Sequence, residues 1–422
     1  MKKLAIITTH PIQYYAPVFK LLCERKKIEI KVLYTWSQAS ASKFDRDFGR
    51  EIEWDIPLLE GYDYEFIKNV SPNPGVYSFF GLINPSLISK IESFNPDAIL
   101  INGWNYLSHL RAMIHFKGRI PVYFRGDSTL LDQNNKLKKR VRKILLKWIY
   151  SFTDKAFYVG TNNKAYFLAA GLKEEQLVYA PHTVNNDFFK ENEPYFEAQA
   201  ENRRRELGIE PGDFVCLFAG KFEPKKNPEL LINAFIHINL QINKSPNQQI
   251  TTSPNQQISK SPNPQISKSP NPQIHLLLVG NGILENELHQ MAAGNPLIHF
   301  LPFQNQSLMP LIYRMADVFC LPSMGPNETW GLAVNEAMAC GRPAIVSDKV
   351  GCAVDLIKPG ENGYIFNHSS QSDLEKCLSL AFQNRQALIL NRPQIQEFIQ
   401  SWSIRECAEK IENEISQSYF LN

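Results

Sequence analysis

The most informative run of the sequence is residues 317–347, which read DVFCLPSMGPNETWGLAVNEAMACGRPAIVS. Its first apolar run ends at Pro322, a polar loop with glycine and proline follows, and a helical pattern extends from about Gly331 to Gly341. A second apolar run begins at Pro343. An apolar strand, a helix and another apolar strand form the repeating unit of a parallel sheet that helices cover on both faces.

The same alternation of apolar runs and helical patterns occurs twice along the chain. It begins with KLAIITT at 3–9, continues to a helical pattern near 161–170, pauses, and restarts with DFVCLFAG at 213–220. We therefore expect an α/β protein with two Rossmann-like, doubly wound domains that face a cleft. The expected boundaries are 1–190 for the N-terminal domain, 191–212 for a linker, 213–395 for the C-terminal domain and 396–422 for a helix that packs back on the body.

Length and composition are those of a globular protein. The 422 residues are enough for two or three domains, and 44% of them are apolar. Lys and Arg number 45 against 42 Asp and Glu, so the net charge is only +3 and nucleic acid is not an expected partner. The seven cysteines form no CxxC pair, which is typical of reduced core residues. These cysteines indicate a cytoplasmic protein, and because no apolar run approaches the length of a membrane-spanning helix, we expect the chain to be soluble or at most peripheral.

One segment interrupts the second half of the chain. Residues 245–274 repeat with a period of eight, as SPNQQITT, SPNQQISK, SPNPQISK and SPNPQI. Repeats rich in Pro, Asn, Gln and Ser bury too little apolar surface to offset the entropy lost on folding. We expect a disordered insert at 243–274, and we favour neutral repeat expansion over a recognition role.

Two carboxylates in the stretch 317–347 are candidates for ligand binding. Glu328 lies in the loop, and Glu336 lies about one and a half turns into the helix that starts near Gly331. Backbone N–H groups at a helix start attract anions, so Gly331 and Leu332 could hold a diphosphate, and Glu336 could then bind a ribose diol. The alternative for either glutamate alone is an ordinary surface carboxylate.

The residues around these glutamates follow an informative order. LPS at 321–323 precedes Glu328, and seven residues separate Glu328 from EAMACG at 336–341 and a strand beginning at Pro343. This order resembles glycosyltransferase family four, whose members are retaining GT-B enzymes that use nucleotide-sugar donors. The resemblance implies that Glu328 contacts the donor sugar near its reacting centre and that Glu336 binds the ribose.

Two further segments resemble the same family. AGKFEPKKNP at 219–228 places Lys221 and Lys226 five residues apart, directly after an apolar run. Two fixed cations here would stabilise the negative charge of a departing nucleoside diphosphate, although Lys221 stands where the family more often has arginine. The sequence VGNG resembles a turn that lines the family's nucleotide pocket, which makes Gly280 and Gly282 candidate binding residues.

The N-terminal domain resembles the family less closely. Most members have a Gly-Gly pair after the first strand, whereas this chain has THPIQYYAPVF at 9–19, similar to a branch with a His-Pro-Ile-Gln loop. We expect His10, Gln13 and Tyr14 at the edge of the cleft, with His10 either acting on the acceptor or capping the loop. Asp127, in the sequence RGDS, either faces the donor sugar or caps a following helix.

A basic segment, KLKKRVRKILLK at 136–147, carries seven cations and no acid. Apolar residues recur at helical spacing along this segment and just after it, and these are Leu137, Val141, Ile144, Leu145 and Trp148. A basic amphipathic helix binds anionic membrane surfaces. The interpretation that we favour for the apolar face is packing on the protein core, which leaves the cations in water.

The resemblance as a whole implies a hexosyltransferase that moves a sugar from a nucleotide-sugar donor to a glycan or glycolipid hydroxyl, with retention at the anomeric carbon. It further implies a role in bacterial cell-surface polysaccharide or glycolipid synthesis, in the cytoplasm or peripherally on the inner face of the membrane. Lysines and a helix start replace the metal in the GT-B plan, so no cofactor is expected, and the Asp-x-Asp at 45–47 is not interpreted as a metal site. The alternatives are a GT-B nucleotide-sugar epimerase and a non-catalytic scaffold that binds nucleotide sugar.

Overall fold

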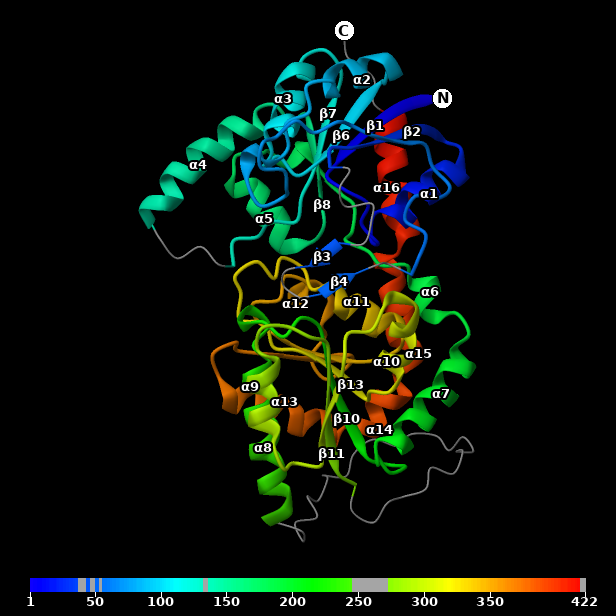
Figure 1. The fold of residues 1–422 in the computed structure, drawn as a ribbon, viewed down its shortest axis with the longest axis vertical. Coiled ribbons are helices and arrows are strands. Elements are labelled where there is room, and N and C mark those ends of the chain that lie inside the picture. The colour runs from blue at the N-terminus through cyan, green and yellow to red at the C-terminus, as the bar shows by residue number, and fades with distance from the viewer. Residues whose placement is uncertain (37–42, 46–49, 53–54, 132–135, 245–271, 418–422) are drawn as a thin grey trace.

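The structure is a computed structural model that describes residues 1–36, 43–45, 50–52, 55–131, 136–244 and 272–417. These residues form two α/β domains, one above the other (Figure 1). Each domain contains one parallel sheet with helices on both faces, as the alternating sequence pattern predicts. The expected fold class of two Rossmann-like domains is therefore confirmed.

The N-terminal domain contains a seven-stranded sheet in the order β5-β2-β1-β6-β7-β8-β9. Its strands are β1 (Lys2–Thr8), β2 (Ile28–Tyr34), β5 (Tyr64–Phe66), β6 (Ala98–Asn102), β7 (Val122–Arg125), β8 (Lys155–Tyr158) and β9 (Leu177–Tyr179). The helices between them are α1 (Ala16–Arg25), α2 (Leu87–Phe94), α3 (Leu107–Phe116), α4 (Lys136–Tyr150) and α5 (Thr161–Ala169). A separate antiparallel pair, β3 (Lys43–Asp45) and β4 (Arg50–Ile52), follows β2.

The C-terminal domain contains a six-stranded sheet in the order β12-β11-β10-β13-β14-β15. Its strands are β10 (Phe214–Ala219), β11 (Ile274–Val279), β12 (Ile298–Leu301), β13 (Val318–Leu321), β14 (Ala344–Ser347) and β15 (Gly363–Phe366). Its helices are α8 (Pro228–Lys244), α9 (Glu285–Ala292), α10 (Met309–Arg314), α11 (Leu332–Ala339), α12 (Ala353–Leu356), α13 (Gln371–Gln383), α14 (Arg385–Leu390) and α15 (Arg392–Phe398). Alternate residues of β10 enter two different apolar cores, so both faces of the sheet are covered.

The expected linker at 191–212 is largely helical. It contains α7 (Glu193–Glu206), which follows the short helix α6 (Asn186–Lys190). Ion pairs fix α7 to the C-terminal domain: Arg342 donates to both oxygens of Glu197, at 2.7 and 2.8 Å. The apolar pattern gives no sign of this helix, because Ala200 is its only buried residue.

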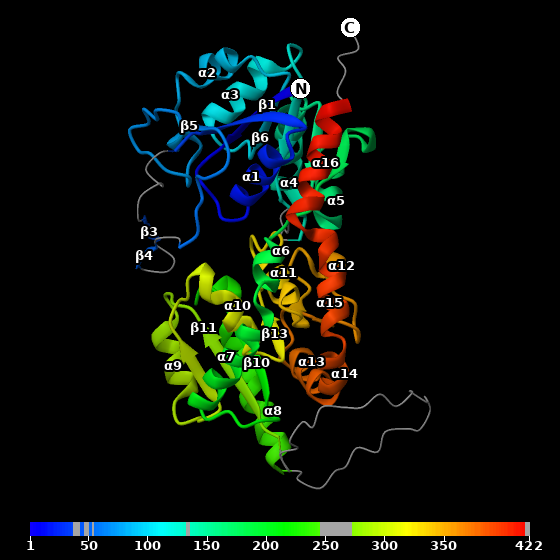
Figure 2. The same ribbon diagram turned by 90° about the vertical axis from the view of Figure 1, so that its right-hand side faces the viewer.

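The last helix returns to the N-terminal domain. Figure 2 shows α16 (Ile404–Gln417) lying along that domain, while α15 lies along the other. Buried residues of α16, among them Ile411 and Ile415, belong to the same apolar core as residues of α1 and β1. Arg25 of α1 donates from Nε to Glu412 at 2.7 Å, which neutralises a fully buried carboxylate.

The structure also bears on the cysteines, the repeat segment, the Asp-x-Asp sequence and the absence of a membrane-spanning helix among the described residues. All seven cysteines are free; six are buried, as expected of core residues, and Cys23 is half-buried. The repeats at 245–271 and Asp47 of the Asp-x-Asp lie outside the described residues. Among the helices that the structure describes, none has the length and apolar character needed to cross a membrane.

Helix α4 differs from the favoured interpretation of its sequence. It projects from the N-terminal domain (Figure 1). The four described residues expected to pack on the core are instead exposed, at 66% for Val141, 73% for Ile144, 47% for Leu145 and 49% for Trp148. The core-packing interpretation is therefore wrong for these four residues, which we call the exposed stripe of α4. Among residues 141–150, whose side chains are described, the helix reaches the core near its C-terminal end, through residues such as Leu146 and Ile149.

Buried histidines make the fold sensitive to acid. His109 of α3 is fully buried, and its Nδ1 donates to the carbonyl of Gly103 at 2.8 Å. Burial lowers the pKa of His109 from its ordinary value to about 4. Burial also lowers the pKa of His299 to about 4, and the neighbouring His275 acts in the same direction.

We expect the free energy of unfolding to fall as the pH is lowered from about 6.5 to about 4. In this range the unfolded chain binds protons that His109 and His299 bind only weakly in the folded state, so acid favours unfolding. Above this range the stabilisation is complete. Urea unfolding at a series of pH values measures the effect, and the His109→Gln variant should show a shallower dependence on pH. An identical dependence in parent and variant would contradict the assignment.

Candidate active site

A cavity of about 350 Å³ lies where the carboxyl ends of the C-terminal strands face the N-terminal domain. Loops after β10, β11 and β13 form its walls, which is the usual place for a ligand in a parallel α/β sheet. The predicted site residues that line it are Gln13, Lys221, Lys226, Gly280, Glu328, Gly331, Leu332 and Glu336. Residues from four separate stretches of sequence are thus brought to one space.

One wall of the cavity carries an ion pair. Lys226 ends a short 3₁₀ helix, Pro224–Lys226, and its Nζ lies 2.5 Å from Oε2 of Glu328. Ser323 donates to the same carboxylate oxygen at 2.8 Å, and Glu328 is 8% exposed. This wall therefore holds a cation and an oriented carboxylate side by side.

A second carboxylate in the cavity is that of Glu336 on α11. It is 4% exposed and accepts hydrogen bonds from Tyr313 at 2.7 Å and from Tyr14 at 3.1 Å. Gln306 lies farther away, with its amide 3.4 Å from Oε1. Burial raises the pKa of Glu336, while the hydrogen bonds from Tyr313, Gln306 and Tyr14 act to lower it. Glu336 is thus an interior hydrogen-bond acceptor rather than a surface carboxylate.

The start of α11 faces the same cavity. Gly331 precedes the helix with a φ of +96°, and a Cβ there would lie 2.8 Å from Cγ1 of Val350. Glycine therefore allows the loop to pass close to Val350 and turn into the helix. Gly331, Leu332 and Ala333 line the cavity, so the first N–H groups of α11, which have no partner within the helix, lie beside the space.

The two glycines of VGNG allow two loops to approach each other. A Cβ on Gly280 would lie 2.0 Å from the carbonyl oxygen of Gly220, and one on Gly282 would lie 2.5 Å from that of Phe222. Gly280 lines the cavity, whereas Gly282 does not. The role of Gly282 in this structure is to let the turn pack against the loop that carries Lys221.

Asp127 and His10 lie outside the cavity lining. Asp127 accepts a hydrogen bond at 2.6 Å from Thr329, the neighbour of Glu328 in the chain, and thus joins the two domains. No helix begins within residues 126–129, so the helix-cap alternative for Asp127 is wrong. His10 lies with Nδ1 2.9 Å from the hydroxyl of Thr9 and its ring edge against Trp36.

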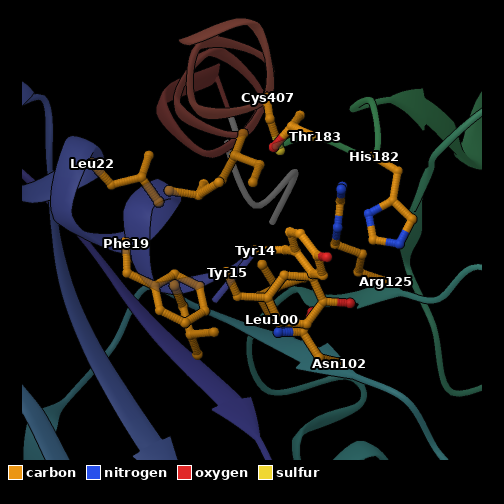
Figure 3. Close-up of a pocket in the computed structure, with 13 residues that line it drawn as sticks. Tyr14, Tyr15, Phe19, Leu22, Leu100, Asn102, Arg125, His182, Thr183 and Cys407 are labelled. Carbon is orange, nitrogen blue, oxygen red and sulfur yellow. The ribbon is translucent and has the colours of Figure 1, made fainter. Parts of the chain in front are cut away.

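A small second pocket lies between the N-terminal domain and α16. Figure 3 shows Tyr14 and Tyr15 near Arg125 and His182 in this pocket. Arg125 donates to the carbonyls of Ala180 and Pro181, at 2.9 and 2.8 Å. Burial lowers the pKa of His182 to about 4, so the ring is neutral near pH 7. These contacts fix the loop that connects the domains.

Sequence reasoning missed the partners of Glu336. Tyr313 and Gln306 were not candidates, and Tyr14 was expected only at the cleft edge. No local signal marks them, because their shared partner lies 23, 30 and 322 residues away in the chain. Among the described residues, no group of three or more His, Cys, Asp or Glu is arranged to hold a metal ion.

The sequence of the C-terminal domain is similar to that of known glycosyltransferases. Residues 260–396 match the family model described as glycosyl transferases group 1. D-inositol 3-phosphate glycosyltransferase of Rhodococcus erythropolis is 27% identical over 179 residues, covering 40% of this chain and 34% of the relative. The enzyme of the same name from Salinispora arenicola is 31% identical over 182 residues, covering 43% and 36%. The chain thus spans about a third of the length of these curated relatives.

Solved structures match nearly the whole chain. Anabaena Alr3699/HepE, in complex with UDP and glucose, matches with a TM-score of 0.66 at 17% identity, covering 99% of this chain and all of that one. Sucrose-phosphate synthase from Thermosynechococcus elongatus gives 0.68 at 16% identity, covering 99% of each chain. The fold and the cleft define the GT-B class of glycosyltransferase folds. Within that class, the C-terminal domain is similar to glycosyl transferases group 1, as the motifs in 317–347 predict.

Proposed function

We propose that this chain is a retaining glycosyltransferase that moves a hexose from a nucleotide-sugar donor to a hydroxyl group of a glycan or glycolipid. The observation that carries the proposal is the cavity in which Lys226, Glu328, Glu336 and the start of α11 surround one space. It supplies positive groups for a diphosphate and carboxylates for sugar and ribose hydroxyls. The similarity of residues 260–396 to glycosyl transferases group 1 supports the same activity.

Each group has a distinct part in the proposed reaction. Lys221, Lys226 and the helix start stabilise the negative charge that the departing nucleoside diphosphate gains. Glu336 accepts hydrogen bonds from the ribose, and Glu328 lies beside the reacting sugar carbon. An oxygen of the departing diphosphate takes the proton of the incoming hydroxyl on the same face, which retains the anomeric configuration. No metal or other cofactor is required, because fixed cations supply the charge.

Residues of the N-terminal domain hold other groups in place and take no part in breaking the bond to the sugar. Asp127 holds Thr329 and thereby the loop that carries Glu328, so we assign it as a positioning residue. Gln13 lines the cavity from the N-terminal domain, where the acceptor side of a GT-B cleft lies. The His-Pro-Ile-Gln loop containing His10 and Gln13 is our candidate for acceptor contact.

Release of nucleoside diphosphate from a panel of nucleotide sugars, with glycan and glycolipid acceptors and with EDTA present, tests the proposal. A transferase releases the diphosphate and labels the acceptor. The two alternatives give other results, since an epimerase changes the sugar without accumulating diphosphate and a scaffold does neither. Activity that EDTA abolishes and Mg²⁺ or Mn²⁺ restores would contradict the metal-independent mechanism.

We further propose that the protein binds the cytoplasmic side of a membrane and acts there in the synthesis of bacterial cell-surface polysaccharide or glycolipid. The exposed stripe of α4 supports this proposal. Spacings of three, four and seven residues place these four apolar side chains on one face of the helix, and all four are exposed while Leu146 and Ile149 are buried. Arg142, Lys143 and Lys147 are exposed beside them, in a segment whose sequence contains no acid. Apolar side chains with cations around them match an anionic bilayer surface.

We expect the parent protein to float with phosphatidylglycerol vesicles and not with phosphatidylcholine vesicles. The double variant Ile144→Ser/Trp148→Ser should bind the anionic vesicles about tenfold or more weakly, because two apolar side chains no longer enter the bilayer. The matched control is Leu390→Ser, which removes a 75% exposed leucine from the other domain and should change nothing. Equal flotation of parent and double variant would contradict the role of α4.

A further inference from the structure

Tyr14 joins the N-terminal domain to the centre of the cavity. It follows β1 in the loop THPIQYY, and its ring packs against the apolar core of the C-terminal domain. It lines both the cavity and the small pocket of Figure 3, in which it lies near Arg125. Its hydroxyl donates to Oε1 of Glu336 at 3.1 Å. The contact therefore crosses the cleft that a ligand would fill.

The acceptor capacity of Glu336 limits what else can bind there. A carboxylate offers about four lone-pair positions on its two oxygens. In this structure Tyr14 and Gln306 take positions on Oε1, and Tyr313 takes one on Oε2. A ribose diol would bring two further donors, so at least one donor of the protein has to leave.

The three protein donors are not equivalent. Tyr313 and Gln306 belong to the same domain as Glu336, and Tyr313 is 1% exposed and packed between the rings of Phe189 and Phe319. Tyr14 comes from the other domain and is half-buried. All three donors line the cavity, but only Tyr14 reaches Glu336 from the opposite domain. Tyr14 can therefore be exchanged without disturbing the core that holds Glu336.

We propose that the Tyr14 hydroxyl and a ribose hydroxyl compete for the same acceptor position on Glu336, so that a bound nucleotide displaces Tyr14. The inference rests on the proposed function, since it takes Glu336 as the ribose ligand. Binding of the nucleotide then exchanges an interdomain hydrogen bond for a bond to the ligand. The loop that carries Gln13 is released in the same step, so occupancy of the donor site is communicated to the acceptor side of the cleft.

Calorimetric titration of the Tyr14→Phe variant tests this exchange. The probes are UDP, GDP and ADP together with their 2′,3′-dideoxy counterparts, which lack the ribose diol. We expect Tyr14→Phe to bind the matching ribonucleotide about tenfold more tightly than the parent, because no hydroxyl competes for the charged acceptor. The dideoxy nucleotide should bind parent and variant equally, since it does not displace Tyr14. Phenylalanine keeps the ring, so the melting temperature should stay within a few degrees of the parent value.

The matched control is Tyr106→Phe, which removes a hydroxyl that donates to the carbonyl of Val76 within the N-terminal domain and does not contact Glu336. Ribonucleotide affinity should remain within about threefold of the parent value, because the donors to Glu336 are unchanged. A parent that binds a ribonucleotide while Tyr14→Phe gains nothing, or gains equally with the dideoxy form, would overturn the inference alone. A parent that binds none of the nucleotides would overturn the proposed function and the inference with it.

Discussion

Replacing Lys226 by alanine is expected to lower kcat by about 10²-fold or more, the scale of removing one preorganised group that stabilises developing charge. The ammonium of Lys226 lines the cavity and lies 2.5 Å from Glu328. Its removal takes a cation from the departing diphosphate and leaves the Glu328 carboxylate unneutralised beside that diphosphate. Both changes raise the energy of the transition state more than that of the bound donor.

Lys225→Ala is the matched control for this experiment. Lys225 belongs to the same short helix, carries the same charge and also lines the cavity, but its ammonium pairs with Glu223 at 3.2 Å. We expect its kcat to remain within about threefold of the parent value, since its charge is not directed to Glu328. Lys221→Ala should fall between the two variants. A kcat of Lys226→Ala within threefold of the parent would refute the assignment of the phosphate site.

Glu328→Gln should likewise lower kcat by about 10²-fold, with little change in donor affinity. The carboxylate stabilises positive charge that appears at the sugar carbon only as the bond breaks, so its loss affects the transition state selectively. Glutamine keeps the shape of the side chain and can still accept the hydrogen bond from Ser323. Steady-state kinetics together with donor titration measure the two effects separately.

Glu336→Gln is the comparison variant, and we expect it to lower donor affinity more than kcat. It should weaken donor binding about tenfold, the scale of hydrogen bonds that lose an ionised partner, with a smaller effect on kcat. The tyrosine hydroxyls around it can both donate and accept, so an amide fits the same place. Equal effects of the two substitutions, as for two surface carboxylates, are the outcome that would exclude the assigned roles.

The sequence predicts best where neighbours in the chain are also neighbours in space. Glu328, Gly331 and Glu336 could be placed correctly because one strand end, one loop and one helix start contain them all. The hydrogen bond between Tyr14 and Glu336 could not be predicted, because it joins two domains across 322 residues. Only the packed fold brings the two side chains together.

Helical periodicity also has a limit that α4 and α7 make plain. The apolar spacing in α4 predicts a helix correctly, but it does not say which part of that helix meets the domain. In α7 the anchors are charged, since Glu197 pairs with Arg342 and Arg204 with Asp317, so an apolar pattern contains no trace of the contact. Apolar periodicity therefore cannot predict contacts that a helix makes through charged residues or through one of its ends.

The position of α16 affects how the chain folds during its synthesis. Most domains complete their structure in the order in which the ribosome makes them. Here the apolar side of α1 and β1 stays uncovered until Ile411 and Ile415 emerge, after the entire C-terminal domain has been translated. The core of the nascent N-terminal domain therefore stays incomplete until α16 has been translated. A fragment that ends before α16 would expose that apolar surface permanently and would tend to aggregate.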